Sequence, residues 1–218
     1  MQLYNYFRSS ASYRVRIAMN LKGLPFDYKA IHLVRNGGEQ RSDAFLALNP
    51  DGLVPIFIDD TRDPPVKLTQ SLAIIEYLDE LHPEPPLLPR EALERARVRT
   101  LAMNIACEIH PVNNLRVLRY LTQVLKVDEA AKNAWYRHWV ETGLQAFEKQ
   151  LVESPMTGTF CHGETPTLAD LALVPQVFNA RRFDCDLSSM PTVLRIVEAC
   201  QERDAFKDAV PSEQPDAE

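Results

Sequence analysis

Residues 8–16 read Arg-Ser-Ser-Ala-Ser-Tyr-Arg-Val-Arg, and this stretch organises the first part of the chain. It follows a short apolar run at residues 3–6 and precedes apolar residues spaced as on one helix face, which are Val15, Ala18, Met19 and Leu21. A strand that turns into a helix through serines leaves N–H groups and hydroxyls at the positive end of the helix dipole. The pattern therefore predicts either an anion site or ordinary serine capping, and this stretch alone leaves both open.

The composition narrows the class of protein. A length of 218 residues is long for one core and favours two domains. The content of 45% hydrophobic and 25% charged residues is typical of a globular protein. A net charge of −6 argues against a nucleic-acid partner, because phosphate binding needs a basic face. The sequence shows no apolar run of membrane-spanning length and no leader, so we expect a cytoplasmic protein without a membrane partner.

The cysteines stand at positions 107, 161, 185 and 200, far apart and without a C-x-x-C pair. Such spacing supports neither a zinc site nor a disulfide framework. We therefore expect free thiols and no bound metal.

The residues before position 82 predict a mixed α/β domain. The expected strands cover residues 3–6, 26–33, 53–58 and 66–69, and the expected helices cover residues 15–21, 44–48 and 72–81. Pro55 lies near the start of a strand, where either a cis Val54–Pro55 bond or a trans proline at a strand edge would fit. Gln70 and Ser71 open a helix directly after a strand, so the chain has a second serine-led helix start.

Prolines at positions 83, 85, 86 and 89 mark residues 83–90 as a stiff linker. It separates a domain at residues 1–82 from a domain at residues 91–218, in which the apolar period is helical throughout. The expected helices there span residues 91–125 with a break at Pro111, a stretch that begins at Asp128, a stretch opened by a Thr167–Asp170 capping box, and residues 193–200. The polar tail at residues 211–218 is expected to be frayed.

This arrangement resembles the soluble glutathione transferases over the whole chain. The resemblance implies a thioredoxin-like first domain that binds glutathione, with Val54-Pro55 at the position of the family's cis-proline, and an all-helical domain that binds substrate. Residues 6–10 and 12–18 are similar to the zeta class, and residues 37–40, 71–78, 173–177 and 182–183 agree with it. One departure is Ala11, which stands where the zeta motif usually carries cysteine and so questions a role for a protein thiol.

The zeta class contains maleylacetoacetate isomerases. The resemblance implies a homodimeric, glutathione-dependent isomerase that converts maleylacetoacetate to fumarylacetoacetate in tyrosine and phenylalanine breakdown, by reversible thiolate addition to the double bond. The alternatives are a maleylpyruvate isomerase of gentisate breakdown, a broad glutathione transferase or dehalogenase, and a glutathione-binding module without catalysis. Leu115 favours maleylacetoacetate, because maleylpyruvate isomerases can carry an arginine there.

The resemblance also implies the site residues. Ser9 and Ser10 are the expected catalytic residues, with a hydroxyl that keeps the glutathione sulfur ionised, and Ser10 is expected to make the direct contact. The expected cofactor contacts are Ser9, Ser10, Ala11, Gln40, Val54, Pro55, Gln70, Ser71, Asn113 and Asn114. The expected contacts to the diketo acid are Arg8, His110, Arg181 and Arg182, because arginine binds carboxylates bidentately. Arg182 is favoured over Arg181, and His110 either contacts a ligand or is a hydrogen-bonded histidine.

Overall fold

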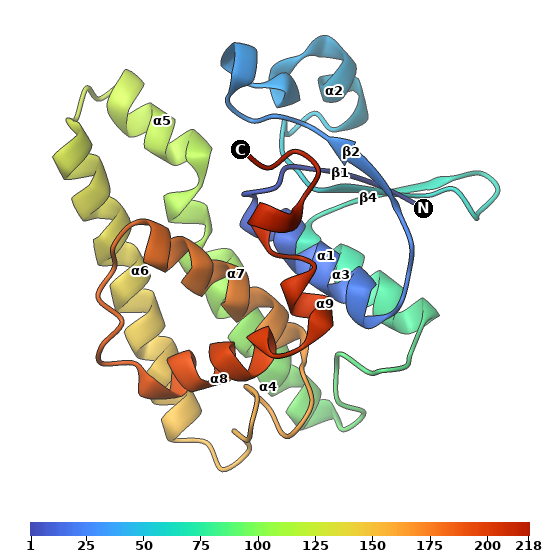
Figure 1. Ribbon diagram of the computed structural model, residues 1–218, viewed down its shortest axis with the longest axis vertical. Helices are drawn as coiled ribbons and strands as arrows, with labels where there is room; N and C mark the ends of the chain where they lie inside the picture. The colour runs from blue at the N-terminus through green and yellow to red at the C-terminus, as the bar shows by residue number, and fades with distance from the viewer. The chain divides into compact units, whose positions relative to one another are not determined.

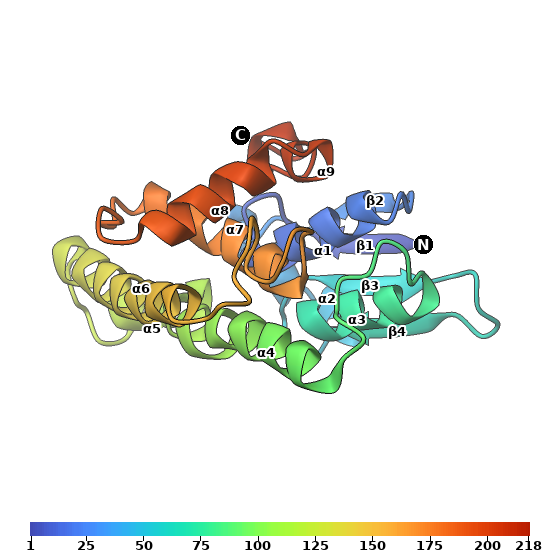
Figure 2. The ribbon, with the colours of Figure 1, turned by 90° about the horizontal axis from the view of Figure 1, so that it is seen from below.

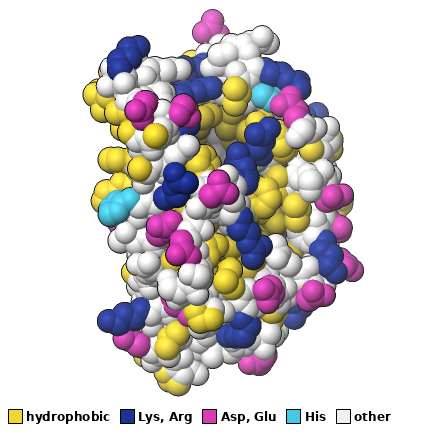
Figure 3. All heavy atoms as spheres, turned by 60° about the vertical axis from the view of Figure 1, so that its left-hand side comes forward, with side chains coloured by type: hydrophobic (Ala, Val, Ile, Leu, Met, Phe, Trp, Pro, Cys, Tyr) yellow, Lys and Arg dark blue, Asp and Glu magenta, His cyan; other side chains and the backbone are white.

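A computed structural model describes residues 1–218 and divides the chain into two compact units. The first unit comprises residues 1–87 together with residues 202–218, and the second comprises residues 88–201. The division at Leu87 falls inside the linker predicted at residues 83–90. None of the helices combines the length and the apolar character needed to cross a bilayer. The surface in Figure 3 mixes acidic and basic side chains, with hydrophobic side chains between them.

The first unit is built on a four-stranded sheet with the order β2-β1-β3-β4. The strands are β1 (Gln2–Asn5), β2 (Asp27–Ala30), β3 (Ile56–Asp59) and β4 (Val66–Thr69). Strands β1 and β2 are parallel, whereas β3 is antiparallel to both β1 and β4. The register places Leu3 opposite Phe57, and both are fully buried. The predicted α/β domain is confirmed.

Two helices lie between strands of this sheet, and a third follows the last strand. They are α1 (Ser10–Leu21), α2 (Asp43–Leu48) and α3 (Ser71–Leu81), with short 3-10 helices at Arg35–Gly37 and Glu39–Arg41. Helix α1 links the parallel strands β1 and β2, as a crossover connection requires. Helices α1 and α3 pack side by side along the sheet (Figure 1). This packing brings the two serine-led helix starts into one part of the unit.

The second unit is all helical, as predicted. Its α-helices are α4 (Ala92–Met103), α5 (Leu115–Gln123), α6 (Glu129–Val152), α7 (Leu168–Arg182) and α8 (Pro191–Gln201). Helix α5 runs beside α6, and α7 beside α8 (Figures 1 and 2). Between α4 and α5 the chain forms a π-helix at Asn104–Ile109 and a 3-10 helix at Pro111–Asn113, so the predicted break at Pro111 is confirmed.

The predicted capping box at the start of α7 is also confirmed. The fully buried Asp170 accepts hydrogen bonds from the Thr167 backbone N–H at 2.7 Å and from the Thr167 hydroxyl at 2.9 Å. Its other carboxylate oxygen accepts from the Cys161 backbone N–H at 2.8 Å. The carboxylate therefore stabilises both the helix start and the preceding loop, since several donors compensate its burial.

The prediction of a frayed tail within the helical domain is wrong. Residues 202–218 pack in the first unit and form α9 (Asp204–Lys207) and a 3-10 helix at Pro211–Glu213. Phe206 and Ala209 are fully buried, and Asp216 accepts hydrogen bonds from the Phe7 backbone N–H at 3.2 Å and from the Tyr28 hydroxyl. Local polarity indicated disorder, but the partners of this segment lie almost the whole chain length away.

The side chain of Arg16 joins three parts of the first unit. It is 1% exposed, and its guanidinium donates to the Asn5 side chain at 3.0 Å, to the Phe7 carbonyl at 2.9 Å and to the Ala209 carbonyl at 3.0 and 3.2 Å. Burial lowers its pKa to about 10, so it remains charged at neutral pH. This one guanidinium therefore connects the end of β1, the turn before α1 and the tail.

Substituting Arg16 by Gln would leave the buried carbonyls of Phe7 and Ala209 without their donor. Each unsatisfied buried group costs about 1–3 kcal/mol, so we expect the free energy of unfolding to fall by about 3 kcal/mol in urea denaturation. Lys207→Gln is the matched control, because its exposed side chain pairs only with the exposed Asp204 at 3.7 Å. Similar losses in the two variants would contradict the role given to Arg16.

Candidate functional site

The first helix start combines a cap with open hydrogen-bonding capacity. Ser9 is the N-cap of α1, and its Oγ accepts from the Ser12 backbone N–H at 3.2 Å. The hydroxyl proton of Ser9 can still be donated to a ligand, because the cap uses only a lone pair of the oxygen. Ser10 is the first residue of α1 and is 4% exposed, and Ala11 beside it is half-buried. Ser9 can thus cap α1 and still donate a hydrogen bond to an anion at this helix start.

The second helix start has an unusual backbone. Gln70 is the N-cap of α3 with φ of 67° and ψ of 112°, and its side chain makes no capping hydrogen bond. A positive φ is strained for a residue with a side chain, and such strain concentrates at functional sites. The N-terminal N–H groups of α3 and the buried hydroxyl of Ser71 therefore lie at a helix start suited to an anion.

Arg14 connects the two helix starts. Its side chain is 2% exposed, and Nη1 donates to the Ser71 hydroxyl at 3.3 Å. This hydrogen bond joins a residue of α1 to the first residue of α3 and orients the Ser71 hydroxyl at that helix start. The sequence motif does not indicate this contact of Arg14, although its position four residues after Ser10 places both residues on one face of α1.

Gln40 and the Val54 loop supply further polar groups. Gln40 is buried, its amide nitrogen donates to the Leu33 carbonyl at 3.4 Å, and its amide oxygen has no hydrogen-bond partner. Val54 is half-buried, Pro55 is buried, and the bond between them is cis.

Two residues without a predicted role shape these segments. Gly38 has a φ of 108°, and a Cβ there would lie 2.6 Å from the Gln40 amide oxygen. The buried Asn49 donates to the Leu53 carbonyl at 2.9 Å and so supports the backbone just before Val54.

In the second unit, the adjacent residues Asn113 and Asn114 differ in the hydrogen bonds that their side chains make. Asn113 is 8% exposed, and both polar atoms of its side chain are buried without a hydrogen-bond partner. Asn114 is the N-cap of α5, with Oδ1 accepting from the Arg116 backbone N–H at 3.1 Å and Nδ2 lying 3.5 Å from His110 Nε2. Because buried polar groups are normally paired, the amide of Asn113 is the better candidate for a ligand contact.

Helix α6 positions the segment that carries Asn113 and also the end of α7. Trp135 donates from its indole N–H to the Val112 carbonyl at 3.0 Å. The next residue, Tyr136, stacks on Phe183 with ring centroids 3.6 Å apart, and burial raises the pKa of its hydroxyl. Helical periodicity in the sequence does not identify the partner of a polar atom such as the indole N–H of Trp135.

The predicted substrate arginines lie at three positions. Arg181 and Arg182 are exposed in the last turn of α7. Arg182 donates to the Asn179 side chain at 2.9 Å, and its guanidinium lies 5.7 Å from the centre of the Phe183 ring. Arg8 precedes the N-cap of α1, and its guanidinium lies 4.6 Å from the centre of the Phe7 ring. Arg182 is therefore oriented by its neighbours at the helix end.

Gln70→Gly tests whether the backbone at the second helix start is strained. Glycine relieves a positive-φ strain of about 1–3 kcal/mol but adds conformational freedom to the unfolded chain, so we expect stability to stay level or rise by about 1 kcal/mol. The resemblance to the glutathione transferases implies that glutathione affinity should also fall, because the Gln70 side chain is lost. Lys126→Gly is the control, since Lys126 also has a positive φ, of 58°, but lies outside the site. A destabilised Gln70→Gly variant would contradict the interpretation of strain.

Comparison with known proteins identifies the family. The family model described as "Glutathione S-transferase, N-terminal domain" matches residues 3–86. A Vibrio cholerae protein named "Probable maleylacetoacetate isomerase" is 50% identical over 215 residues, which cover 99% of this chain and 97% of that protein.

Two solved structures are similar over the whole chain. A holo structure of maleylpyruvate isomerase, described as a bacterial glutathione-S-transferase in the zeta class, has 49% sequence identity and a TM-score of 0.95, with full coverage of both chains. Maleylacetoacetate isomerase from Methylobacterium extorquens AM1, solved with bound malonate and GSH, has 39% identity and a TM-score of 0.94, again with full coverage of both. This chain therefore belongs to the zeta-class glutathione transferases, the family of the maleylacetoacetate and maleylpyruvate isomerases.

Proposed function

We propose that this protein is a glutathione-dependent cis–trans isomerase that converts maleylacetoacetate to fumarylacetoacetate in tyrosine and phenylalanine breakdown. The observation that carries the proposal is the full-length similarity, at 50% identity, to a protein named as a probable maleylacetoacetate isomerase. The homodimer and the cytoplasmic location implied by the family resemblance are further parts of the proposal.

The polar groups of the chain fit glutathione. The tripeptide carries two carboxylates, an amine and two peptide groups, and the buried amide of Asn113 and the amide oxygen of Gln40 both lack partners. We propose that the start of α3 at Gln70 and Ser71, with Arg14 beneath it, binds the γ-glutamyl carboxylate. The Val54 backbone binds the cysteinyl peptide group, and Gln40 binds the glycyl end.

When bound, glutathione supplies a thiolate that adds reversibly to the conjugated double bond, which permits rotation about a single bond. The residues at the start of α1 keep that sulfur ionised. A hydroxyl that donates a hydrogen bond at the positive end of a helix favours the thiolate over the thiol. Ser10 is the proposed direct donor, and Ser9 both caps the helix and retains a proton to donate.

We propose that arginines hold the carboxylates of the diketo acid and stabilise the negative charge that develops on its carbonyl oxygen. Arg8 and Arg182 are the main candidates for these contacts, and Arg181 is a third candidate because it adjoins Arg182. One preorganised donor at such a developing charge contributes about 2.7–4 kcal/mol to the transition state. His110 contacts the Asn114 amide. We therefore propose that His110 positions the Asn113–Asn114 segment and does not contact the reacting atoms.

Maleylpyruvate is the second candidate substrate, because the maleylpyruvate isomerase structure is 49% identical over the full chain. Leu115 favours maleylacetoacetate, because the resemblance implies that maleylpyruvate isomerases can carry an arginine at this position to bind the second carboxylate of their substrate. A broad transferase would use the same thiolate but would release a modified glutathione. A module that only binds glutathione is disfavoured by the presence of serine hydroxyls at both helix starts.

Turnover on maleylacetoacetate and maleylpyruvate, with and without glutathione, tests the proposal. We expect kcat/KM for maleylacetoacetate to be about tenfold higher, because the two acids differ by one methylene before the second carboxylate, and such a difference is worth about 1–3 kcal/mol in substrate discrimination. Turnover should require glutathione and leave its concentration unchanged. Faster turnover of maleylpyruvate would favour the second candidate, and consumption of glutathione in proportion to product would favour a transferase.

Serine variants test the start of α1. We expect Ser10→Ala to lower kcat/KM at least about tenfold and to leave the fold intact, since Ser9 and not Ser10 is the N-cap of α1. Ser9→Ala should also lower the free energy of unfolding by about 1 kcal/mol, because it removes the N-cap. Ser154→Ala is the control, since Ser154 belongs to the second unit and its hydroxyl oxygen accepts from the Met156 backbone N–H at 3.3 Å, outside the proposed site. An unchanged rate for Ser10→Ala would remove Ser10 from the proposed role.

A further inference from the structure

Three cationic or donor side chains of the first unit surround the carboxylate of Glu218. Arg35 donates from Nη2 to Glu218 Oε1. His32 Nε2 lies 3.4 Å from Glu218 Oε2, and Arg8 Nη2 lies 4.0 Å from the same oxygen. The hydrogen bond from Arg35 holds the pKa of Glu218 below its usual value, so this carboxylate is charged at neutral pH.

The hydrogen bonds of His32 determine which ring nitrogen carries the proton. Its Nδ1 accepts from the backbone N–H groups of Arg35 at 2.7 Å and of Val34 at 3.2 Å. A neutral imidazole with an accepting Nδ1 carries its proton on Nε2, which is the atom that faces Glu218. His32 is 7% exposed, and Nε2 is buried without a hydrogen bond. The groups of Arg8, His32 and Arg35 that face the Glu218 carboxylate are therefore all hydrogen-bond donors.

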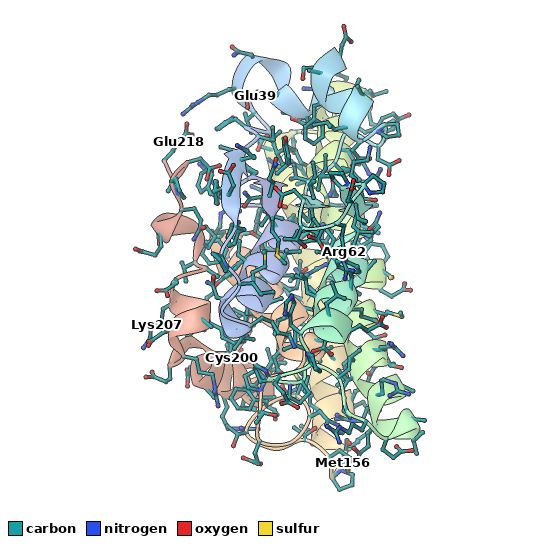
Figure 4. All side chains as sticks on the ribbon, turned by 90° about the vertical axis from the view of Figure 1, so that its right-hand side faces the viewer. Glu39, Arg62, Met156, Cys200, Lys207 and Glu218 are labelled. Atoms are coloured by element: carbon teal, nitrogen blue, oxygen red, sulfur yellow. The ribbon has the colours of Figure 1, made fainter.

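The surrounding structure fixes these donors. The ring of Tyr6 packs edge-on against His32 at a centroid distance of 5.0 Å. Glu39 accepts from the His32 backbone N–H at 2.7 Å, and Asp216 accepts from the Phe7 backbone N–H and the Tyr28 hydroxyl. Figure 4 shows Glu39 and Glu218 toward the same end of the first unit. The carboxylates of Glu39 and Asp216 therefore already have partners in the fold.

Glu218 differs from them because it is accessible. Its side chain is 40% exposed, and those of Arg8 and Arg35 are 38% and 61% exposed. Exposed ion pairs are weak and exchange readily with ions in solution. A carboxylate from a ligand can therefore replace that of Glu218 without any change in the buried part of the site.

We propose that Arg8, His32 and Arg35 form a carboxylate-binding site and that Glu218 occupies it as an internal competitor. The ligand is a small acid with a free carboxylate at the end of an open chain. That carboxylate belongs either to a dicarboxylate like the proposed substrate or to the glycyl end of glutathione, which these three side chains would then bind together with Gln40. The competition itself is independent of the proposed reaction, and only its consequence for turnover rests on that function.

Glu218→Gln tests the competition, because it keeps the shape of the side chain and removes the charge. The control is Glu213→Gln, which makes the same change in net charge at an exposed residue of the same segment. We expect calorimetric titration at low ionic strength to show malonate binding about three- to tenfold tighter in Glu218→Gln than in Glu213→Gln or the parent, since a larger fraction of the site is open. Adding Arg35→Gln to Glu218→Gln should reverse the gain.

A second titration distinguishes the two sources of the carboxylate. If the site takes the glycyl end, Glu218→Gln should strengthen the binding of glutathione but not of glutathione esterified at its glycyl carboxylate. If it takes a dicarboxylate, malonate should gain and the two tripeptides should be unaffected. Equal affinities of Glu218→Gln and Glu213→Gln for malonate and for glutathione would overturn the proposal, whether or not the protein isomerises maleylacetoacetate.

Discussion

The first unit depends on one buried positive charge, the guanidinium of Arg16. Its donors reach the end of β1, the carbonyl of Phe7 before α1 and the carbonyl of Ala209 in the tail. Each of these acceptors is buried, so each needs the donor that Arg16 provides. The turn that carries Arg8 and Ser9 is thereby held between a sheet strand and a segment from the other end of the sequence.

Whether a buried polar group has a hydrogen-bond partner also distinguishes structural residues from candidate functional residues. Asn114 uses its side-chain oxygen to cap α5, whereas the neighbouring Asn113 keeps its whole amide buried and unpaired. Ser9 caps α1 with an oxygen lone pair and retains its proton. A fold that pairs nearly all its buried polar groups leaves partners unmade chiefly where a ligand supplies them. We therefore regard the two helix starts as the strongest candidate features of the first unit, and Asn113 as the strongest of the second.

The tail shows how an acidic segment can serve both structure and binding. Asp216 is fully engaged by the Phe7 N–H and the Tyr28 hydroxyl, and burial raises the pKa of Tyr28, so the phenol remains a donor. Glu218 instead faces solvent and three side chains suited to a carboxylate. Two acids in one short segment thus differ in function, because Asp216 is half-buried and paired within the fold whereas Glu218 is exposed.

The sequence by itself determined the order of strands and helices, the proline-rich boundary, the break at Pro111, the capping box at Thr167 and the family, because these depend on local periodicity, capping and motif spacing. It also indicated serines at both helix starts as site residues. Only the tertiary structure decided that Arg14 links those starts, that Trp135 positions the Asn113 segment, and that residues 202–218 pack in the first unit. These features depend on contacts between residues far apart in the chain, and neither hydrophobic period nor polarity specifies which distant partner a buried polar group will find.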